Sequence, residues 1–296
     1  MRRMRGGLWA SALTLVLAAC GGTVGSSSPA SVPRASGTVS VLYAASLLNL
    51  MEKEVGPRFD AATGAHFEGY AGGSQALANQ IKGGVRRADV FISAVPSVNA
   101  LLEGAANGDW VSWYVSFARA PLVIGYNPSS RFAAALKREP WYEVLTEPGI
   151  RIGRTDPALD PKGKLTVQAL EEAQSVYHRP GLAAQTESSS QVFPEEDLVG
   201  RLQAGQLDVG FFYSNEAKEA GIPTVGLGKV SLAAQFTATL VRDAPNPSGG
   251  VAFLDYLLGS KGRAILLQHG LTVLSYQVSG QRSAVPKSLR PVLGLS

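Results

Sequence analysis

Two serines in this chain stand where an apolar run gives way to a helical pattern, and small residues flank both. Ser46 follows the run Val39–Ala44, and Ser74 follows Gly72 and Gly73. Backbone amides at the start of a helix, together with hydroxyls, donate hydrogen bonds to anions without adding a counter-charge. The spacing therefore predicts either helix N-caps or donors to a bound anion, and the residue types alone leave both interpretations open.

A second group of polar residues falls in the middle of the chain. Asp160 and Lys162 lie in the loop 156–163, and Tyr213 ends the apolar run Leu207–Tyr213. From the residue types alone, Tyr213 is a core aromatic whose phenol needs some other partner. On the same basis, Lys162 is a solvated surface charge.

Motifs for catalysis or for a metal ion are weak by comparison. The three histidines, His66, His178 and His269, are scattered, and none has the spacing of metal ligands. The stretch Gly72–Ala76 lacks the final glycine of the G-x-S-x-G turn, and neither a P-loop nor an H-E-x-x-H motif occurs. We therefore expect a protein that is not an enzyme. The alternative that stays open is an extracytoplasmic hydrolase whose catalytic residues assemble only in space.

The segments that must position these residues alternate between strand and helix. Short apolar runs rich in β-branched residues predict strands, and apolar residues three or four apart predict helices between them. This alternation indicates an α/β fold with largely parallel sheets. The predicted strands are 39–44, 66–70, 88–94, 121–126, 150–154, 207–213 and 236–242, and the predicted helices begin near residues 46, 74, 96, 164, 195 and 251.

The charge distribution argues against a nucleic-acid partner. The chain has 296 residues, of which 45% are hydrophobic and 17% charged, and a net charge of +4. Three bases without an acid fall in residues 1–19, and five bases without an acid fall in residues 256–296, so residues 20–255 carry an excess of four negative charges. No basic run with interleaved aromatic residues remains to follow a phosphate backbone. The length fits one large domain or two lobes.

The N-terminus has the pattern of an export signal followed by an anchor. Three arginines precede the apolar run Leu8–Leu17, which is too short to span a bilayer, and Cys20 follows two alanines. This cysteine resembles that of the lipobox of bacterial lipoproteins, which receives a lipid. An ordinary signal peptide that happens to contain a cysteine is the alternative. We expect a lipoprotein signal peptide over residues 1–19, a lipidated Cys20, and a flexible tether over residues 20–37 that holds the folded part to a membrane outside the cytoplasm.

A series of short stretches, in order over residues 39–275, resembles the molybdate- and tungstate-binding proteins of ABC importers. The resemblance implies an α/β, two-lobed periplasmic-binding-protein fold of type II, with a mostly parallel sheet flanked by helices in each lobe and the ligand in the cleft between the lobes. It also implies lobe I over residues 38–120 and 228–296, lobe II over residues 121–227, an ABC permease as partner, and a monomer. The stretches are Tyr43–Leu47, Gly72–Ser74, Gln80–Gly84, Ala88–Ala94, Asp156–Gly163, Glu196–Leu198 and Gly210–Tyr213.

By the same resemblance, both lobes donate hydrogen bonds to the oxyanion. Ser46 gives its hydroxyl and amide, and Gly73 or Ser74 fills a second serine position. In lobe II, a tyrosine hydroxyl and the backbone amides of Lys162 and Leu198 are implied to donate. Molybdenum or tungsten enters only as the oxyanion, without a resident cofactor. The oxyanion-binding residues are thus predicted to be Ser46, Gly73, Ser74, Asp160, Lys162, Leu198 and Tyr213.

Asp160 departs from the bacterial pattern, which has an apolar residue before this proline. An aspartate does occupy the position in the archaeal branch, where a glutamate one residue before the tyrosine is its partner, but this chain has Phe212 there. We therefore expect Asp160 to hydrogen-bond loop amides and to leave the anion four-coordinate. Carriers of sulfate, phosphate or another small anion share the fold and stay open as alternatives. Phosphate does so because its proton needs an acceptor, and Asp160 is one.

Overall fold

The computed structural model of the protein describes residues 36–296, which fall in one compact unit. The predicted signal peptide, Cys20 and residues 20–35 of the predicted tether lie outside the described residues. No helix within residues 36–296 is long and apolar enough to cross a membrane.

The described strands form one mixed sheet. Its neighbours follow the order β2-β1-β3-β9-β4-β7-β5-β6, and β8 and β10 each pair with β4. The strands are β1 (Thr38–Ala44), β2 (His66–Gly72), β3 (Val90–Ser93), β4 (Trp113–Tyr126), β5 (Ile152–Arg154), β6 (Ser190–Val192), β7 (Val209–Tyr213), β8 (Thr224–Gly226), β9 (Ala233–Leu240) and β10 (Thr272–Gly280).

Helices flank this sheet, and three of the predicted helices are 3-10 turns in whole or in part. The turns lie at Ala45–Leu47, Pro96–Leu101 and Glu195–Asp197. The turn at Ala45–Leu47 follows β1 and the turn at Glu195–Asp197 precedes α8, and both carry residues of the candidate site. The α-helices are α1 (Leu48–Leu50), α2 (Gly56–Thr63), α3 (Ser74–Lys82), α4 (Ala133–Leu136), α5 (Trp141–Val144), α6 (Pro161–Val176), α7 (Leu182–Ser189), α8 (Leu198–Gln203), α9 (Ser214–Glu219), α10 (Pro247–Leu258) and α11 (Ser260–Gln268).

Parallel pairing forms a three-strand core in each half of the sheet. β1 pairs in parallel with β2 and β3, and β5 pairs in parallel with β6 and β7. Each of these connections passes through a helix, as parallel strands require. β4 and β9 run antiparallel to their neighbours and join the two halves. The predicted α/β architecture is confirmed, and its parallel part is these two cores.

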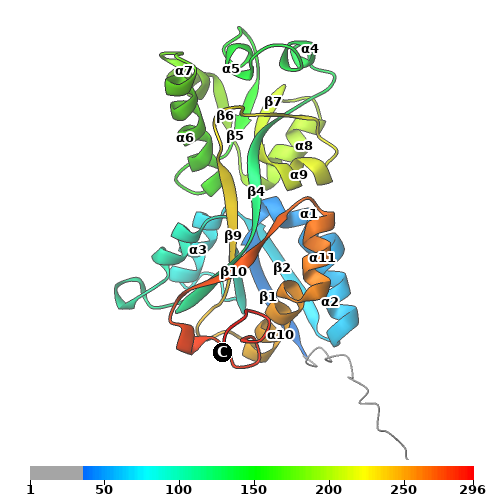
Figure 1. Cartoon of the computed structure of the whole chain (residues 1–296), viewed down its shortest axis with the longest axis vertical. Coiled ribbons are helices and arrows are strands. Elements are labelled where there is room, and N and C mark those ends of the chain that lie inside the picture. Colours follow the sequence, from blue (N-terminus) through cyan, green and yellow to red (C-terminus); the bar gives the residue numbers. More distant parts are fainter. Residues whose placement is uncertain (1–35) are drawn as a thin grey trace, which may run out of the picture. The chain divides into compact units, whose positions relative to one another are not determined.

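β4 belongs to both halves of the sheet. Val115–Pro121 pair with β9, and Leu122–Tyr126 pair with β7. The sequence pattern predicts this strand only from Pro121, because proline usually borders a strand, whereas the strand begins at Trp113. Figure 1 shows β4 and β9 running between two groups of elements. We call these groups lobe I (β1–β3, β9 and β10 with α1–α3, α10 and α11) and lobe II (β5–β8 with α4–α9).

Apolar packing holds the strands that lead to the site. In lobe I, the Phe253 ring stacks on Phe67 at 5.6 Å between centroids and meets Phe59 edge-on at 5.2 Å. In lobe II, Phe212 of β7 is buried in a cluster with Leu202 of α8. Aromatic pairs of this kind add to the stability that their burial provides. This packing therefore holds the carboxyl ends of β1 and β7 in place, where the turn Ala45–Leu47 and helix α9 begin.

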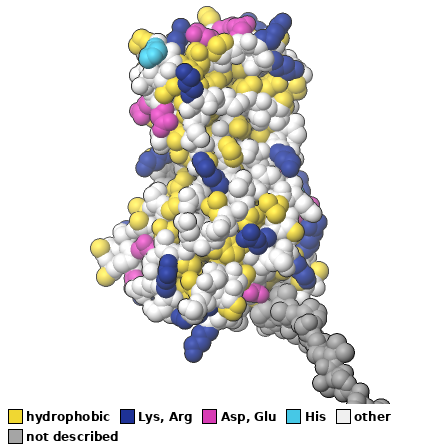
Figure 2. Space-filling view, in the orientation of Figure 1, with side chains coloured by type: hydrophobic (Ala, Val, Ile, Leu, Met, Phe, Trp, Pro, Cys, Tyr) yellow, Lys and Arg dark blue, Asp and Glu magenta, His cyan; other side chains and the backbone are white. Residues whose placement is uncertain are grey.

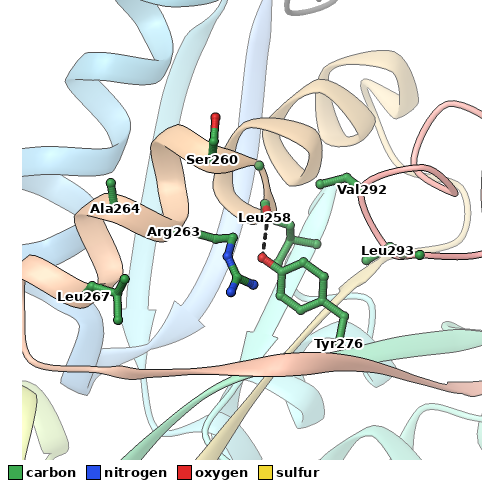
Figure 3. A pocket seen from close by; sticks show the side chains of 10 residues that line it. Leu258, Ser260, Arg263, Ala264, Leu267, Tyr276, Val292 and Leu293 are labelled. Atoms are coloured by element: carbon green, nitrogen blue, oxygen red, sulfur yellow. Dashed lines mark hydrogen bonds between the residues drawn. The ribbon is translucent and has the colours of Figure 1, made fainter.

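The C-terminal residues, for which the sequence pattern predicts no structure, are part of lobe I. β10 pairs antiparallel with β4, and Val285, Leu289 and Leu293 are buried. A cavity of about 770 Å³ lies between this segment and α10–α11, and Figure 3 shows Arg263 beside the Tyr276 ring, whose hydroxyl donates to the Leu258 carbonyl. This cavity is built from lobe I alone.

Charged side chains on the face drawn in Figure 2 are spread over both lobes. Lys and Arg alternate with apolar and neutral side chains and do not gather in a stripe on that face of residues 36–296. Within the described part of the chain, this face therefore shows no basic stripe, and the polar groups of interest are the buried ones next to the strand ends.

Candidate functional site

Ser46 lies in the 3-10 turn that directly follows β1. The turn begins at Ala45, and the Ser46 side chain caps no helix, so the N-cap interpretation of this serine is wrong. The side chain is 2% exposed, and its hydroxyl has no hydrogen-bond partner among the described residues. Asn215 at the start of α9 donates to the Ser46 carbonyl at 2.9 Å. This contact ties the turn of lobe I to lobe II.

Gly73 and Ser74 form the second predicted donor position of lobe I. Ser74 is fully buried at the start of α3, where its Oγ accepts the Ala94 amide at 3.1 Å, which leaves its hydroxyl hydrogen available. A Cβ atom on Gly73 would lie 2.7 Å from the Leu159 carbonyl oxygen of lobe II. Only glycine therefore allows the lobes to approach this closely here.

Asp160 caps the N-terminus of α6. Its Oδ1 accepts the amides of Lys162 at 2.9 Å and Gly163 at 3.3 Å, and also the Thr155 hydroxyl at 2.7 Å. These three donors stabilise negative charge on the carboxylate. Its Oδ2 is buried and has no partner within residues 36–296. The prediction that Asp160 holds loop amides is thus confirmed for one of its two oxygens.

Lys162 is fully buried, which the solvated-surface interpretation did not anticipate. Its ammonium lies 2.8 and 3.0 Å from the two oxygens of Glu216 and 3.3 Å from Oε1 of Glu195. Although burial opposes the charged form, Glu216 and Glu195 raise the pKa of Lys162 above its ordinary value. Its amide donates to Oδ1 of Asp160, whereas the resemblance implied that it donates to the anion.

Glu195 and Glu216 are site residues that the sequence analysis missed. Glu195 belongs to the turn before α8 and is 2% exposed; its Oε2 accepts the Ala45 amide of lobe I at 3.0 Å. Burial and then the charge of Asp160 raise its pKa well above the ordinary value, against the opposing effect of Lys162. Glu216 accepts the Tyr213 amide at 3.3 Å, and burial raises its pKa while Lys162 opposes the rise. A buried lysine requires such partners, but its burial cannot be read from the sequence.

Tyr213 ends β7 with a fully buried side chain. Its ring meets Phe236 of β9 edge-on at 6.1 Å, and the Lys162 ammonium lies 5.6 Å from the ring centroid. The hydroxyl has no partner in the described part of the chain. Burial, followed by the charges of Asp160 and Glu195, raises the pKa of Tyr213 well above its ordinary value. The phenol therefore stays protonated and can donate.

Leu198 is placed differently from the other predicted residues. It begins α8, and its buried side chain belongs to the apolar cluster that contains Phe212. The turn that precedes it carries Glu195 into the site. The structure thus places Asp160, Lys162 and Tyr213 together, and Ser46 on a cavity with their partners Glu195 and Glu216. Gly73 lies next to Asp160, Ser74 follows it at the start of α3, and the Leu198 side chain belongs to the core.

Two cavities meet these residues between the lobes. One of about 280 Å³ is lined by Gly73 and Asp160, and the other, of about 170 Å³, by Ser46 and Glu216. Glu195 lines both. No cluster of three or more His, Cys, Asp or Glu suited to a metal ion occurs within residues 36–296. The two cavities therefore bring Ser46, Asp160, Glu195 and Glu216 to whatever enters. The Lys162 ammonium is paired with two of these carboxylates, Glu195 and Glu216.

Most of the chain matches one protein family. The model of a family described as bacterial extracellular solute-binding protein matches residues 39–272. The chain belongs to this family. That assignment makes the protein a solute-binding protein by family.

Relatives of this solute-binding protein carry names that specify molybdenum or molybdate and tungstate. A putative ABC transporter molybdenum-binding protein of Haloferax volcanii is 35% identical over 191 residues, which are 64% of this chain and 59% of that protein. The chain thus spans about three fifths of that relative. A molybdate/tungstate-binding protein, WtpA, of Thermococcus kodakarensis is 23% identical over 321 residues, which are 89% of this chain and 90% of that one.

Solved structures of low identity share the fold. The periplasmic molybdate-binding protein of Azotobacter vinelandii matches with a TM-score of 0.64 and 19% identity, over 80% of this chain and 99% of that chain. The sulfate-binding protein SubI of Mycobacterium tuberculosis matches with a TM-score of 0.61 and 16% identity, over 87% and 91% of the two chains. The predicted two-lobed periplasmic-binding-protein fold of type II is confirmed.

Proposed function

We propose that this solute-binding protein captures molybdate or tungstate outside the cytoplasm and delivers it to an ABC permease. One observation carries the proposal. The buried hydroxyls of Ser46 in lobe I and Tyr213 in lobe II have no partner among the described residues. The Tyr213 ring lies beside the Lys162 ammonium, and Ser46 lines a cavity with Glu216, which is paired with that ammonium. A tetrahedral oxyanion without protons offers only acceptors, and such unpartnered donors fit it.

The position of these donors on two lobes suggests how capture is signalled. An oxyanion that contacts Ser46 and Tyr213 together gains both hydrogen bonds only when the lobes are closed. It therefore shifts the population toward the closed form, which the permease recognises. We assign lobe I to residues 38–120 and 228–296 and lobe II to residues 121–227, and the ligand to the cleft between them.

The proposed site includes two groups of residues with different tasks. Ser46, Ser74 and Tyr213 donate hydroxyls, and Lys162 supplies the positive charge. Gly73 permits close approach of the lobes, and Asp160 shapes the loop. Leu198 begins α8 and donates its backbone amide to the anion. The protein acts as a monomeric carrier, and we propose no catalytic residue and no cofactor.

Titration calorimetry of the protein with molybdate, tungstate, sulfate and phosphate tests the ligand assignment. We expect one site per chain that prefers molybdate or tungstate. Phosphate is the second candidate, because Asp160 Oδ2 and Glu195 Oε1 are buried acceptors that a protonated phosphate could satisfy. A preference for phosphate would move the assignment to that ligand, and turnover of generic esters or glycosides would contradict a binding function.

The membrane anchor is a separate proposal that rests on the sequence around Cys20. A lipoprotein signal peptide over residues 1–19 and lipidation of Cys20 would hold the protein at a membrane, because two acyl chains anchor a protein durably. Metabolic labelling with a fatty acid tests this. The wild-type chain should take up label and stay with membranes, whereas Cys20→Ala should lose the label and be released or left unprocessed. A wild-type chain without label would contradict the anchor and leave the binding function untouched.

A further inference from the structure

The buried charges around the site do not balance. Three carboxylates, Asp160, Glu195 and Glu216, face a single cation, Lys162, and all four side chains are almost or fully buried. If every acid were ionised, the group would carry two excess negative charges before any ligand entered. A dianion would raise the excess to four in a site with little water to compensate, which is prohibitive.

The hydrogen bonds show which acid is the best place for a proton. Glu216 is paired through both oxygens with the Lys162 ammonium, at 2.8 and 3.0 Å. Oδ1 of Asp160 already accepts three donors. Glu195 has only the Ala45 amide on Oε2, while its Oε1 lies 3.3 Å from the Lys162 ammonium without a hydrogen bond to it.

A second observation couples Glu195 to Asp160. The charge of Asp160 helps to raise the pKa of Glu195, after burial. Two ionised carboxylates have acceptors only, so a hydrogen bond between these two groups needs a proton on one of them. The unpartnered oxygens within residues 36–296 include Oδ2 of Asp160 and Oε1 of Glu195. A proton on Oε1 of Glu195 makes this oxygen a donor and Oδ2 of Asp160 its acceptor.

We propose that Glu195 is a specificity-determining residue that holds a proton when the oxyanion is bound and uses it as a hydrogen-bond donor, so that capture of the dianion is linked to that proton. The inference rests on the proposed function. The proton passes from solvent to Oε1 of Glu195 and is shared between Asp160 and the ligand; no covalent bond to the oxyanion forms. Glu195 lines both interlobe cavities.

The sign of the pH dependence follows from linkage. A bound dianion stabilises the protonated form of Glu195, so the pKa of this carboxyl is higher in the complex than in the free protein. Affinity is therefore constant at low pH and falls by up to about tenfold per pH unit once the pH exceeds the pKa of the free form. The titratable groups around Glu195 come from three places. Asp160 and Lys162 belong to the start of α6, and Tyr213, Glu216 and Glu219 to β7 and α9. Glu196 belongs to the same turn as Glu195 and lines the same cavity.

Molybdate titrations of the wild-type protein between about pH 6 and pH 9, in buffers of different ionisation enthalpy, test the proposal. The Glu195→Gln variant keeps a side-chain donor but cannot ionise, so its affinity should stay level with pH. The wild-type affinity should fall with pH, with about one proton taken up where it falls.

Two variants control for other acids. Glu196→Gln changes the exposed neighbour in the same turn, and Glu219→Gln removes a buried carboxyl whose pKa burial raises to about 7. Both should keep the wild-type pH dependence. The same slope in wild type and Glu195→Gln, transfer of the slope to Glu219, or loss of binding in Glu195→Gln at every pH would overturn the inference. No molybdate binding by the wild type at any pH would overturn the proposed function and this inference with it.

Discussion

The two faces of the interlobe cleft are built from different chemistry. Lobe I presents neutral donors just after its strands, namely the hydroxyls of Ser46 and Ser74. Lobe II presents ionisable groups, with the buried Lys162 among the carboxylates around it. Neutral donors on fixed turns define where an anion can sit, whereas buried charges define how strongly the site attracts it and at what pH. Variants of the neutral donors should therefore lose oxyanion affinity alone, whereas loss of the buried cation should lower both affinity and stability.

Lys162→Met should have the largest effect of any single change. It leaves Glu195 and Glu216 buried without their cation, which costs about 3–5 kcal/mol of unfolding free energy. Oxyanion affinity should fall at least about a hundredfold. Differential scanning calorimetry and molybdate titration measure the two losses. The matched control is Lys164→Met, on the same helix but exposed, which should change neither. A Lys162→Met protein of wild-type stability and affinity would contradict the charge assignment of lobe II.

The neutral hydroxyls should affect affinity without affecting stability. Ser46→Ala and Tyr213→Phe each remove a donor that has no protein partner within residues 36–296. Hydrogen bonds to charged groups contribute roughly 1.5–3 kcal/mol, so each variant should lose about tenfold to a hundredfold in oxyanion affinity. Titration calorimetry measures the loss, and thermal unfolding of the free protein should be unchanged.

Tyr177→Phe is the contrasting control for these hydroxyls. The Tyr177 hydroxyl donates to the Leu227 carbonyl at 2.8 Å and accepts the Lys229 amide at 2.6 Å, remote from the site residues. Its removal should lower the unfolding free energy by about 1–3 kcal/mol and leave affinity unchanged. Unchanged affinity in both Ser46→Ala and Tyr213→Phe would falsify the donor assignment.

Gly73→Ala tests the close approach of the two faces. The added methyl would meet the Leu159 carbonyl at 2.7 Å, and a backbone atom cannot swing away as a side chain can. The lobes must then stay slightly apart, at a cost of about 1–3 kcal/mol, which lowers affinity about fivefold to a hundredfold. Titration with molybdate measures this loss. Gly226→Ala in β8, where an added Cβ meets nothing within 4 Å, should bind as the wild type does. Equal affinity in Gly73→Ala would show that the lobes do not need this contact.

Asp160→Asn should have the smallest effect and the opposite sign. Asparagine keeps an oxygen for the amides of Lys162 and Gly163 but removes a negative charge beside the ligand. Affinity should be unchanged or rise by less than about tenfold, since like charges oppose binding. Asp156→Asn, in the same loop, is the control and should leave titrations unchanged. A large loss in Asp160→Asn alone would mean that its charge takes part in binding.

The difference between the two faces also explains what could be predicted from the sequence. Ser46 and Gly73–Ser74 follow strands of strong pattern, and positions at strand ends are local properties of the chain. The alternation of strand and helix gave the α/β fold for the same reason, because each parallel core is built from consecutive segments. Trp113–Ala120 was missed because a proline inside a long strand imitates its start.

The charged face could not be predicted, because it depends on contacts between distant segments. Glu195 reaches Ala45 across 150 positions of the chain, and Lys162 meets Glu216 across 54. In sequence, Lys162 has the pattern of a surface residue, and Glu195 is one of three consecutive acids. Only the burial of all of them together reveals an excess of acid around one base.

The structure of the protein bound to molybdate is the most direct test of the account. We predict one anion between the lobes, with its oxygens about 2.7–3.2 Å from the hydroxyls of both Ser46 and Tyr213 and with the Lys162 ammonium still paired to Glu216. An anion bound outside the cleft, or one that contacts a single lobe and leaves either hydroxyl unpartnered, would contradict it.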